Sequence, residues 1–332
     1  MAGLSALPVR QPGIEYGEAL PLFWNPSMPE LSAAANSISM LMPYVEPLIA
    51  RTMRAAAAEL DEPLRTRTLA FARQELAHHS QHRRFNDELL AQCPGLARAE
   101  KWIERAYARM DRKWSPSFKV ASAAASETIA FSIARWVETH MTTIFDGADP
   151  RAVRLFTWHL AEEVEHKTAA FDVFEATGGR RLRYTGAAVV SLLVLIWFTY
   201  TCSLTMLHHH HRLRLPVAWF RLARWSFSLA FTLLPLLGAS CLPNHGPRVL
   251  ADPPYLTQWL RGLPTRRQQH RAHADDAVPA HHAEDEAVGG VVDVAQPQAS
   301  APDGERDRDG DEAAGAGGQP AGVLAEDLDD RG

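Results

Sequence analysis

Two Glu-x-x-His segments lie about 90 residues apart, and they limit the fold of this chain more than any other feature. Each segment has one further histidine at a neighbouring helical turn. Residues spaced by three, four or seven positions share one face of an α-helix. Each segment therefore offers one carboxylate and two imidazoles along a single helical stripe. The residues are Glu75, His78 and His82 in FARQELAHHSQHRRFN, and His159, Glu163 and His166 in WHLAEEVEHKTAAFDVF.

Prolines, glycines and capping residues divide the chain into segments of helical periodicity. An N-cap followed by proline, as in Asp149-Pro150, predicts a helix start, and the pair Gly178-Gly179 predicts an end. The sequence has no alternating strand pattern of useful length, so we predict an all-α fold. The expected helices cover roughly 31–60, interrupted by Pro43 and Pro47, then 62–90, 97–114, 115–147 and 149–179.

The ligand chemistry of these segments suggests a metal site. Carboxylates can bridge or chelate metal ions, and neutral imidazoles supply one nitrogen ligand each. Two Glu-x-x-His helices, with one further glutamate from each of two other helices, form the ligand set of ferritin-like di-iron and di-manganese bundles. The pattern therefore predicts a ferritin-like four-helix bundle that binds two divalent metal ions. The ligand types favour iron, with zinc and manganese as alternatives.

The two remaining glutamate ligands are expected on the first and third bundle helices. Glu127 lies in the small, apolar run ASETIAFS, where an unpaired carboxylate would be costly to bury. Glu46, in MPYVEPLIA, is the best candidate on the first helix, although Pro47 disfavours helical geometry at the residue before it. Glu30 and Glu59 are the alternatives to Glu46.

The other polar residues of the two segments leave their roles open. His82 and His159 are either third nitrogen ligands or hydrogen-bond partners of the ligands. We expect Glu162 and Glu165 to face solvent or neighbouring helices. Asp172 either orients a ligand histidine or forms a salt bridge on the helix surface.

An apolar region follows the predicted bundle. Residues 186–207 contain no charge over 22 positions, which is long enough to cross a bilayer. A second, shorter apolar stretch at 225–242 contains Pro235. Arginines precede the first stretch and also lie between the two, so a two-span hairpin would conflict with the positive-inside tendency. We favour membrane association, at the inner face of the cytoplasmic membrane, over a pair of buried or interfacial helices that cover the bundle.

The last part of the chain differs in composition from the rest. From Pro264 onward there are six Arg against sixteen Asp or Glu, and there is no aromatic residue. Such a segment cannot bury enough apolar area to offset the entropy of ordering it, so we predict a disordered acidic tail. The expected organisation is an extended lead-in at 1–30, a metal-binding bundle at 31–180, an apolar helical segment at 181–263 and the tail at 264–332.

Some classes of protein are disfavoured by the sequence. The three cysteines are far apart and form no C-x-x-C pair, which is typical of a reducing compartment and not of a disulfide scaffold. The N-terminus has no basic start followed by an apolar core, so we expect a cytoplasmic protein without a secretory signal. The sequence contains no zinc-finger spacing, P-loop or strongly basic field, so we expect no nucleic-acid partner.

The two motif segments also resemble the signature segments of a bacterial family of predicted metal-dependent hydrolases. The pattern of that family is Q-E-x-x-H-x-x-x-H-x-x-x-N and W-H-x-x-E-E-x-E-H-K-x-x-x-F-D-V. The resemblance covers about residues 20–250, including the opening PLFWNPSMPELS, and it implies a metal-dependent enzyme. The matching positions are Gln74, Glu75, His78, His82 and Asn86, then Trp158, His159, Glu162, Glu163, Glu165, His166, Lys167, Phe171, Asp172 and Val173.

The predicted metal site is compatible with three kinds of function. In a metal-dependent hydrolase, two cations would lower the pKa of a water molecule and polarise a substrate oxygen. In a di-iron oxidase or oxygenase, the same carboxylate-rich ligands would hold iron for oxygen activation. The third possibility is a non-enzymatic bundle that stores metal or uses it structurally. The family resemblance places the hydrolase first, and the apolar segment points to a small, hydrophobic substrate.

Overall fold

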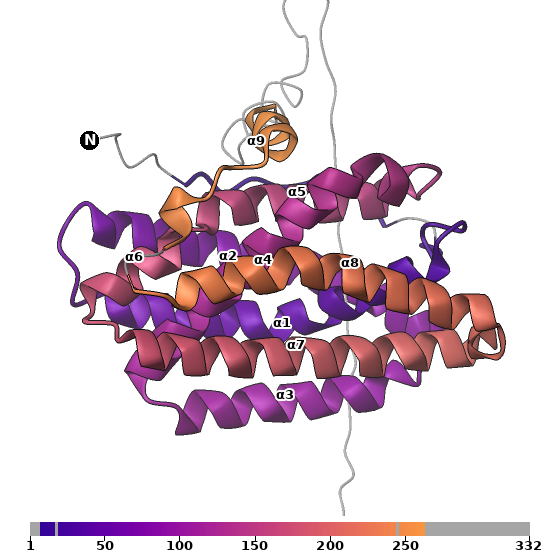
Figure 1. Ribbon diagram of the computed structural model, residues 1–332, viewed down its shortest axis with the longest axis horizontal. Helices are drawn as coiled ribbons and strands as arrows, with labels where there is room; N and C mark the ends of the chain where they lie inside the picture. Colours follow the sequence, from indigo (N-terminus) through magenta and orange to yellow (C-terminus); the bar gives the residue numbers. More distant parts are fainter. Residues whose placement is uncertain (1–6, 17–18, 244–245, 263–332) are drawn as a thin grey trace, which may run out of the picture. The chain divides into compact units, whose positions relative to one another are not determined.

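Proline occupies the first turn of five of the α-helices, where its missing N–H costs no hydrogen bond. The computed structural model describes residues 7–16, 19–243 and 246–262, so the tail predicted at 264–332 lies outside the described residues. The all-α expectation is confirmed (Figure 1). The α-helices are α1 (Pro29–Ala57), α2 (Leu64–Gln92), α3 (Leu96–Lys113), α4 (Pro116–Phe145), α5 (Pro150–His166), α6 (Ala169–Ala176), α7 (Arg181–His209), α8 (Pro216–Cys241) and α9 (Pro254–Arg261), with short 3-10 turns η1 (Arg212–Arg214) and η2 (Pro247–Val249).

Four helices, α1, α2, α4 and α5, carry all the predicted metal residues. The short connection 58–63 joins α1 to α2, and 146–149 joins α4 to α5, so the four helices form two hairpins. These hairpins meet where α1 packs against α4 and α2 packs against α5. Outside them, α3 contacts α1 and α7, and α9 packs on α5 (Figure 1).

Side-chain caps precede α4 and α5, and the one before α5 is the cap predicted at Asp149-Pro150. Ser115 Oγ accepts a hydrogen bond from the Phe118 N–H (3.3 Å), and Asp149 Oδ1 accepts one from the Arg151 N–H (2.9 Å). Each side chain satisfies one of the N–H groups that a helix start leaves without an intrahelical partner. These local contacts fix where two of the four bundle helices begin.

The predicted interruption of the first helix is wrong, because α1 continues through Pro43 and Pro47. Pro43 has no N–H to donate to the carbonyl of Ser39, four residues earlier. Asn86 on α2 replaces that donor, with its Nδ2 donating to the Ser39 carbonyl over 2.9 Å. A neighbouring helix thus compensates for one of the hydrogen bonds that proline removes. The continuous helix directs Glu46 into the bundle, where it is only 2% exposed.

The fourth predicted helix is broken in the structure, which is a second departure from the expectation. α5 ends at His166, and α6 begins at Ala169. At the break, Thr168 Oγ1 accepts a hydrogen bond from Arg67 on α2 (2.9 Å). Gly178 then follows the end of α6 with a φ of 72°, as the glycine pair predicts.

The two apolar helices α7 and α8 lie over α1 and α4 (Figure 1). One face of each is buried in the core, with Tyr184 and Phe198 on α7 and Trp225 on α8 among the buried side chains. Burying a large apolar side chain stabilises a fold by about 1.5–3 kcal/mol. Tyr184 also donates a hydrogen bond to Thr128 Oγ1 on α4 (2.8 Å). By length and composition both helices could cross a membrane, and their outer faces are exposed.

Candidate metal centre

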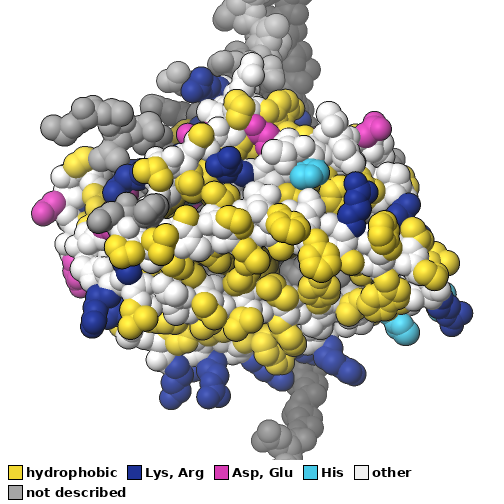
Figure 2. All heavy atoms as spheres, viewed as in Figure 1, with side chains coloured by type: hydrophobic (Ala, Val, Ile, Leu, Met, Phe, Trp, Pro, Cys, Tyr) yellow, Lys and Arg dark blue, Asp and Glu magenta, His cyan; other side chains and the backbone are white. Residues whose placement is uncertain are grey.

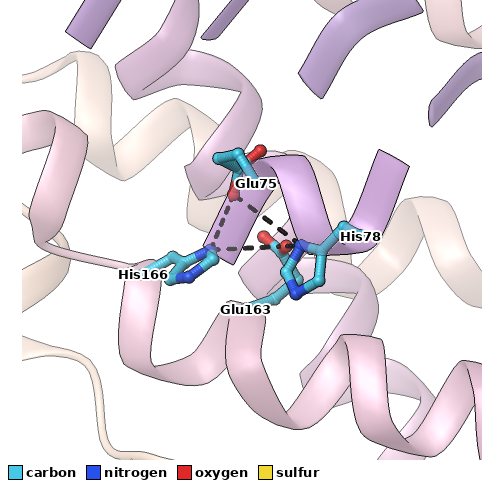
Figure 3. A group of neighbouring side chains, drawn as sticks. All are labelled: Glu75, His78, Glu163 and His166. Carbon is cyan, nitrogen blue, oxygen red and sulfur yellow. Dashed lines mark ion pairs between the residues drawn. The ribbon is translucent and has the colours of Figure 1, made fainter. Parts of the chain in front are cut away.

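The two Glu-x-x-His motifs meet in the interior of the bundle (Figure 3). His166 Nδ1 lies 3.0 Å from Glu75 Oε1. His78 Nδ1 and His166 Nδ1 each lie 3.4 Å from Glu163 Oε1. At most 4% of any of these four side chains is exposed. Two ligands at about 2.1 Å from one ion can be no more than about 4.2 Å apart, so these spacings suit metal coordination.

Glu46 and Glu127 reach the same cluster from α1 and α4. Glu127 Oε2 lies 3.6 Å from His166 Nδ1, and Glu46 Oε1 lies 3.4 Å from His159 Nε2. Ligand atoms of Glu46, His78 and His159 form a second group within 4.8 Å of one another. The cluster thus has one side near His166 and another near His159.

Glu75 and Glu163 lie between these two sides. Glu163 Oε1 is 3.0 Å from His159 Nε2 on α5 and 3.4 Å from both His166 Nδ1 on α5 and His78 Nδ1 on α2. Glu75 Oε1 is 3.8 Å from His78 Nδ1 and 3.0 Å from His166 Nδ1. Each carboxylate therefore contacts imidazoles of both motif helices. A glutamate in such a position can bridge two cations.

Six atoms at the centre of the cluster have no hydrogen-bond partner among the described residues. A buried polar atom without a partner costs about 1–3 kcal/mol, and native structures contain few of them. Cations between these atoms would satisfy all six, so the donor set fits a metal site. The atoms are both carboxylate oxygens of Glu46, Glu75 Oε1, His78 Nδ1, Glu127 Oε2 and His166 Nδ1.

Each motif histidine is oriented by the residue that precedes the motif glutamate on the other helix. His78 Nε2 donates to Glu162 Oε2 (2.9 Å), and His166 Nε2 donates to Gln74 Oε1 (3.0 Å). An acceptor at Nε2 holds a proton there and leaves the Nδ1 lone pair for a cation. The two helices thereby direct both Nδ1 atoms into the cluster.

The N-terminal lead-in closes this network from outside. Arg10 Nη1 lies 3.2 Å from Glu162 Oε1, and the Arg10 side chain is only 10% exposed. In the same segment, the Pro8 carbonyl accepts a hydrogen bond from Gln74 Nε2 (3.0 Å). Of the two orientations expected for Glu162, the structure therefore shows the one towards a neighbouring helix, between His78 and Arg10.

His82 and His159 form a hydrogen-bonded chain that leads away from the cluster. Ser39 Oγ donates to Asn86 Oδ1 (2.7 Å), so it accepts from His82 Nδ1 (2.8 Å). Because the His82 proton is then on Nδ1, His82 Nε2 accepts from His159 Nδ1 (2.7 Å). This order of donors leaves the His159 Nε2 lone pair facing Glu163 Oε1 (3.0 Å) and Glu46 Oε1 (3.4 Å). The structure places His159 at the cluster and His82 behind it.

Comparison with known proteins identifies the family. A family model described as predicted metal-dependent hydrolase matches residues 8–248. The chain belongs to this family. No curated protein and no solved structure gives a significant match. The matched range includes Arg10 at one end and all of α8 at the other, so the lead-in and the apolar helices are both parts of this hydrolase-family fold.

Burial sets the charge states in the cluster. Burial raises the pKa of Glu46 and of Glu127 well above the ordinary value, and neighbouring carboxylates raise it further. Burial also lowers the pKa of His78 to about 3, so this imidazole is neutral. Burial opposes the charges on Glu163 and His166, but their attraction lowers the pKa of Glu163 and raises that of His166. Protons therefore occupy the cluster, and cation binding must release them.

Of the glutamates considered on the first helix, Glu46 is the one that faces the cluster. Glu30 is buried, but its carboxylate binds Arg212 (3.0 Å) and Arg221 (3.5 Å). Glu59 is exposed and lies beyond the end of α1. The position of Glu46 therefore follows from the continuity of α1.

Two further acidic residues of the family segments lie outside the cluster. Glu165 Oε2 is 2.8 Å from Arg10 Nη1. Asp172 Oδ2 is 2.8 Å from Arg67 Nη1, and its other oxygen contacts Arg248. Asp172 thus takes the salt-bridge role, which was one of the two interpretations of its position.

Residues that hold the ligands in place were harder to find in the sequence. Arg10 and Ser39 lie in no motif, and their roles depend on tertiary contacts. A signal did exist for Gln74 and Glu162, because each directly precedes the glutamate of a Glu-x-x-His motif. Each of these acceptors holds the histidine of the other motif, so both motifs need an acceptor at this position.

Proposed function

We propose that this chain is a metal-dependent hydrolase whose cluster binds two divalent cations. The observation that carries the proposal is the set of buried ligand atoms without hydrogen-bond partners. When ionised, the carboxylates of Glu46, Glu75, Glu127 and Glu163 would balance the charge of two such cations. One cation would be held by Glu46, His78 and His159, the other by Glu127 and His166, with Glu75 and Glu163 shared.

Two bound cations supply a water molecule of lowered pKa and polarise a substrate oxygen. The residues of the chain position the water molecule and the substrate and exclude bulk water. Glu162 and Gln74 keep the motif imidazoles in the tautomer that ligation needs. His159 is the least buried member of the cluster, with 10% of its side chain exposed. We therefore place substrate entry on the His159 side.

The proposed substrate is a small molecule with an ester or phosphoester bond and an apolar part. Its reacting group would meet the carboxylates and imidazoles of the cluster. Apolar side chains border the cluster, because Phe156 contacts the His82 ring and Trp158 contacts the His78 ring. Apolar walls around a few polar groups are typical of small-molecule sites.

A second candidate function is oxygen activation by a di-iron oxidase or oxygenase. The observation that favours it is the ligand set, in which carboxylates outnumber imidazoles and come from four helices. Such sets bind iron in carboxylate bundles, and iron suits these ligands at least as well as zinc does. The identity of the bound metal separates the two candidates.

The proposal is tested by measuring metal content and turnover together. The full chain, purified without a histidine tag, would be assayed by elemental analysis, by its anaerobic absorption spectrum and with ester and phosphoester substrates. Glu75→Gln and Glu163→Gln should lose the metal and the activity. Glu30→Gln is the matched control, because Glu30 is equally buried but pairs with Arg212 outside the cluster.

Each result has a distinct meaning. Two zinc or manganese ions per chain, with hydrolysis that both cluster variants abolish, support the hydrolase. Two irons with a spectrum that changes on exposure to oxygen support the second candidate instead. Bound metal without turnover of either kind leaves a non-enzymatic metal-binding bundle. A wild-type chain that binds no metal after reconstitution contradicts all three.

A further inference from the structure

The outer faces of α7 and α8 form a continuous apolar surface. On α7 the exposed apolar side chains of Val189, Leu193, Ile196 and Tyr200 are three or four residues apart, and Leu193, near the middle, is 60% exposed. On α8 the same spacing gives a second stripe, in which Phe231 is 80% exposed. Figure 2 shows hydrophobic side chains gathered over these two helices. The stripes comprise Leu182, Val189, Leu193, Ile196, Trp197 and Tyr200 on α7, and Phe220, Phe227, Phe231 and Leu234 on α8.

This surface extends onto α3 through a pair of tryptophans. Trp102 of α3 is 46% exposed, and its ring centroid lies 4.0 Å from that of Trp197 on α7. Tryptophan side chains are enriched where apolar lipid meets water, because the ring is large and its N–H is polar. We call the combined surface of α7, α8 and Trp102 the apolar platform.

The charge on the segment that contains α7 and α8 has a single sign. The sequence from 176 to 251, which contains both α7 and α8, has eight arginines and no Asp or Glu. Further cations project from α3, along the lower edge of the surface in Figure 2. Several of these side chains form no ion pair with any residue that the structure describes. They are Arg180, Arg183, Arg214 and Arg224 next to α7 and α8, and Arg98, Lys101 and Arg105 on α3.

Contacts on the opposite faces hold α7 and α8 flat on the bundle. Ser203 of α7 hydrogen bonds Ser37 of α1 (2.9 Å), and both side chains are buried. Trp136 Nε1 of α4 donates to Ser228 Oγ of α8 (2.9 Å). Turning the two helices into a membrane-spanning hairpin would break these contacts and expose the core that Tyr184 and Trp225 help to fill.

A second copy of the chain is a poor occupant for this surface. In a symmetric dimer the same patch meets itself. The unpaired arginines of one copy would then face those of the other, and α7 and α8 have no acidic residue to neutralise them. An anionic lipid surface supplies both the apolar phase and the negative charge that the platform lacks.

We propose that the apolar platform binds the surface of a bilayer that contains anionic phospholipids, with α7 and α8 lying along the membrane plane. The exposed stripes enter one leaflet, and the arginines and the α3 cations contact lipid phosphates. The metal-centre side of the bundle stays in the water phase. This inference does not depend on the proposed hydrolase activity, because it rests on surfaces that contain none of the cluster residues.

Vesicle flotation tests the proposal with the full chain. Vesicles of phosphatidylcholine, with and without phosphatidylglycerol, would be mixed with the detergent-free protein and floated through a density gradient. We expect binding that is stronger with phosphatidylglycerol and that weakens at high salt. Arg214→Ala with Arg224→Ala should weaken binding to the anionic vesicles about 25-fold, at about fivefold for each arginine near the surface.

Two variants separate binding through the platform from nonspecific adhesion to vesicles. Leu193→Glu with Phe231→Glu should abolish flotation, since both side chains lie in solvent in the free protein and their replacement leaves the core intact. Val249→Glu is the matched control, because Val249 is 75% exposed but lies outside α7 and α8. Circular dichroism would check that both variants keep their helicity. Flotation that is lost equally in the Val249 control, or retained in the Leu193/Phe231 variant, contradicts the proposal.

Two further measurements exclude the rival arrangements. A His210→Cys variant, bound to preformed vesicles, should react with a membrane-impermeant maleimide, because the turn after α7 stays on the outer surface. Protection of this cysteine until the vesicles are lysed would show a spanning hairpin and overturn the in-plane arrangement. A wild-type chain that binds no vesicles but forms a dimer, which Phe231→Glu dissociates, would overturn the proposal in favour of a second copy.

Discussion

Replacing Glu162 with leucine removes the acceptor that holds a proton on His78 Nε2. In the structure Glu162 Oε2 and His78 Nε2 are 2.9 Å apart, and both side chains are 0% exposed, so solvent cannot replace the contact. Without it, the imidazole is free to change tautomer or to rotate, and Nδ1 is no longer held towards Glu75 and Glu163. Loss of an outer hydrogen bond of this kind costs about 10–100-fold in metal affinity, or about 1.4–2.8 kcal/mol.

Titration of the metal-free protein with a divalent cation would measure this effect. The wild type should show two binding steps. In Glu162→Leu the step on the His78 side should weaken by about 10–100-fold, while the step on the His166 side, which depends on Gln74, should change little. Glu162→Gln keeps an acceptor oxygen at the same place and should recover most of the affinity.

Glu165→Leu provides the matched control for this experiment. Glu165 lies on the same helix and also binds Arg10 and, at 3.4 Å, Gln74 Nε2, but it contacts neither motif histidine. Both variants therefore lose one partner of Arg10, and Glu162→Leu alone releases His78. Equal losses of metal affinity in the two variants would refute the reasoning. So would an unchanged binding step on the His78 side in Glu162→Leu.

Three further changes probe other parts of the structure. Chelation of the metal should lower Tm by about 5–10 °C, because a ligand at 100 times its Kd stabilises the folded state by about 2.7 kcal/mol. Scanning calorimetry, with metal added back as the control, measures this shift, and an unchanged Tm contradicts the prediction. Since burial raises the pKa of Glu46 and Glu127, protons compete with cations, so metal affinity should rise as pH rises through these raised values. Calorimetry in buffers of different ionisation enthalpy should detect the released protons, and a pH-independent affinity would count against the assignment of these two ligands. Asn86→Leu should lower the free energy of unfolding, measured in urea, by about 1–3 kcal/mol. The Ser39 carbonyl, which receives no hydrogen bond from Pro43, would lose its donor. An unaltered midpoint of urea unfolding would show that the contact contributes nothing.

Local rules predicted much of the helical framework. Ser115 and Asp149 mark helix starts because capping depends on neighbouring residues alone. The spacing of Glu75 and His78 likewise predicts one helix face, since helix geometry is the same in every fold. These features required no knowledge of the tertiary structure. From these features we expected the two motif helices to face each other, because the ligands on one helix face can bind a cation jointly only with ligands on another helix.

Tertiary contacts explain what the sequence did not reveal. Pro43 suggests a broken helix, but the donor that keeps α1 continuous comes from Asn86 on another helix. The role of Arg10 depends on a lead-in that folds back over α5, about 150 residues away in sequence. His82 and His159 could not be told apart by spacing, because the difference lies in the order of hydrogen-bond donors that begins at Ser39 and Asn86.

The apolar helices illustrate a different limit of sequence patterns. A run of 22 uncharged residues meets the length requirement for a membrane span. It has the same composition whether it spans a bilayer, covers a core or lies at an interface. Burial of Tyr184 and Phe198 on one face of α7, beside exposure of Leu193 on another, shows a helix that packs on the bundle and keeps an apolar outer face, and neither can be read from hydropathy alone.

The central claim is that the cluster holds two cations, and anomalous X-ray diffraction at the absorption edge of the bound metal tests it most directly. We expect two peaks inside the bundle, one beside Glu46, His78 and His159 and the other beside Glu127 and His166. Glu75 and Glu163 should lie within coordination distance of both. A single ion in the cluster, or ions only at the exposed histidines 208–211, would contradict the claim.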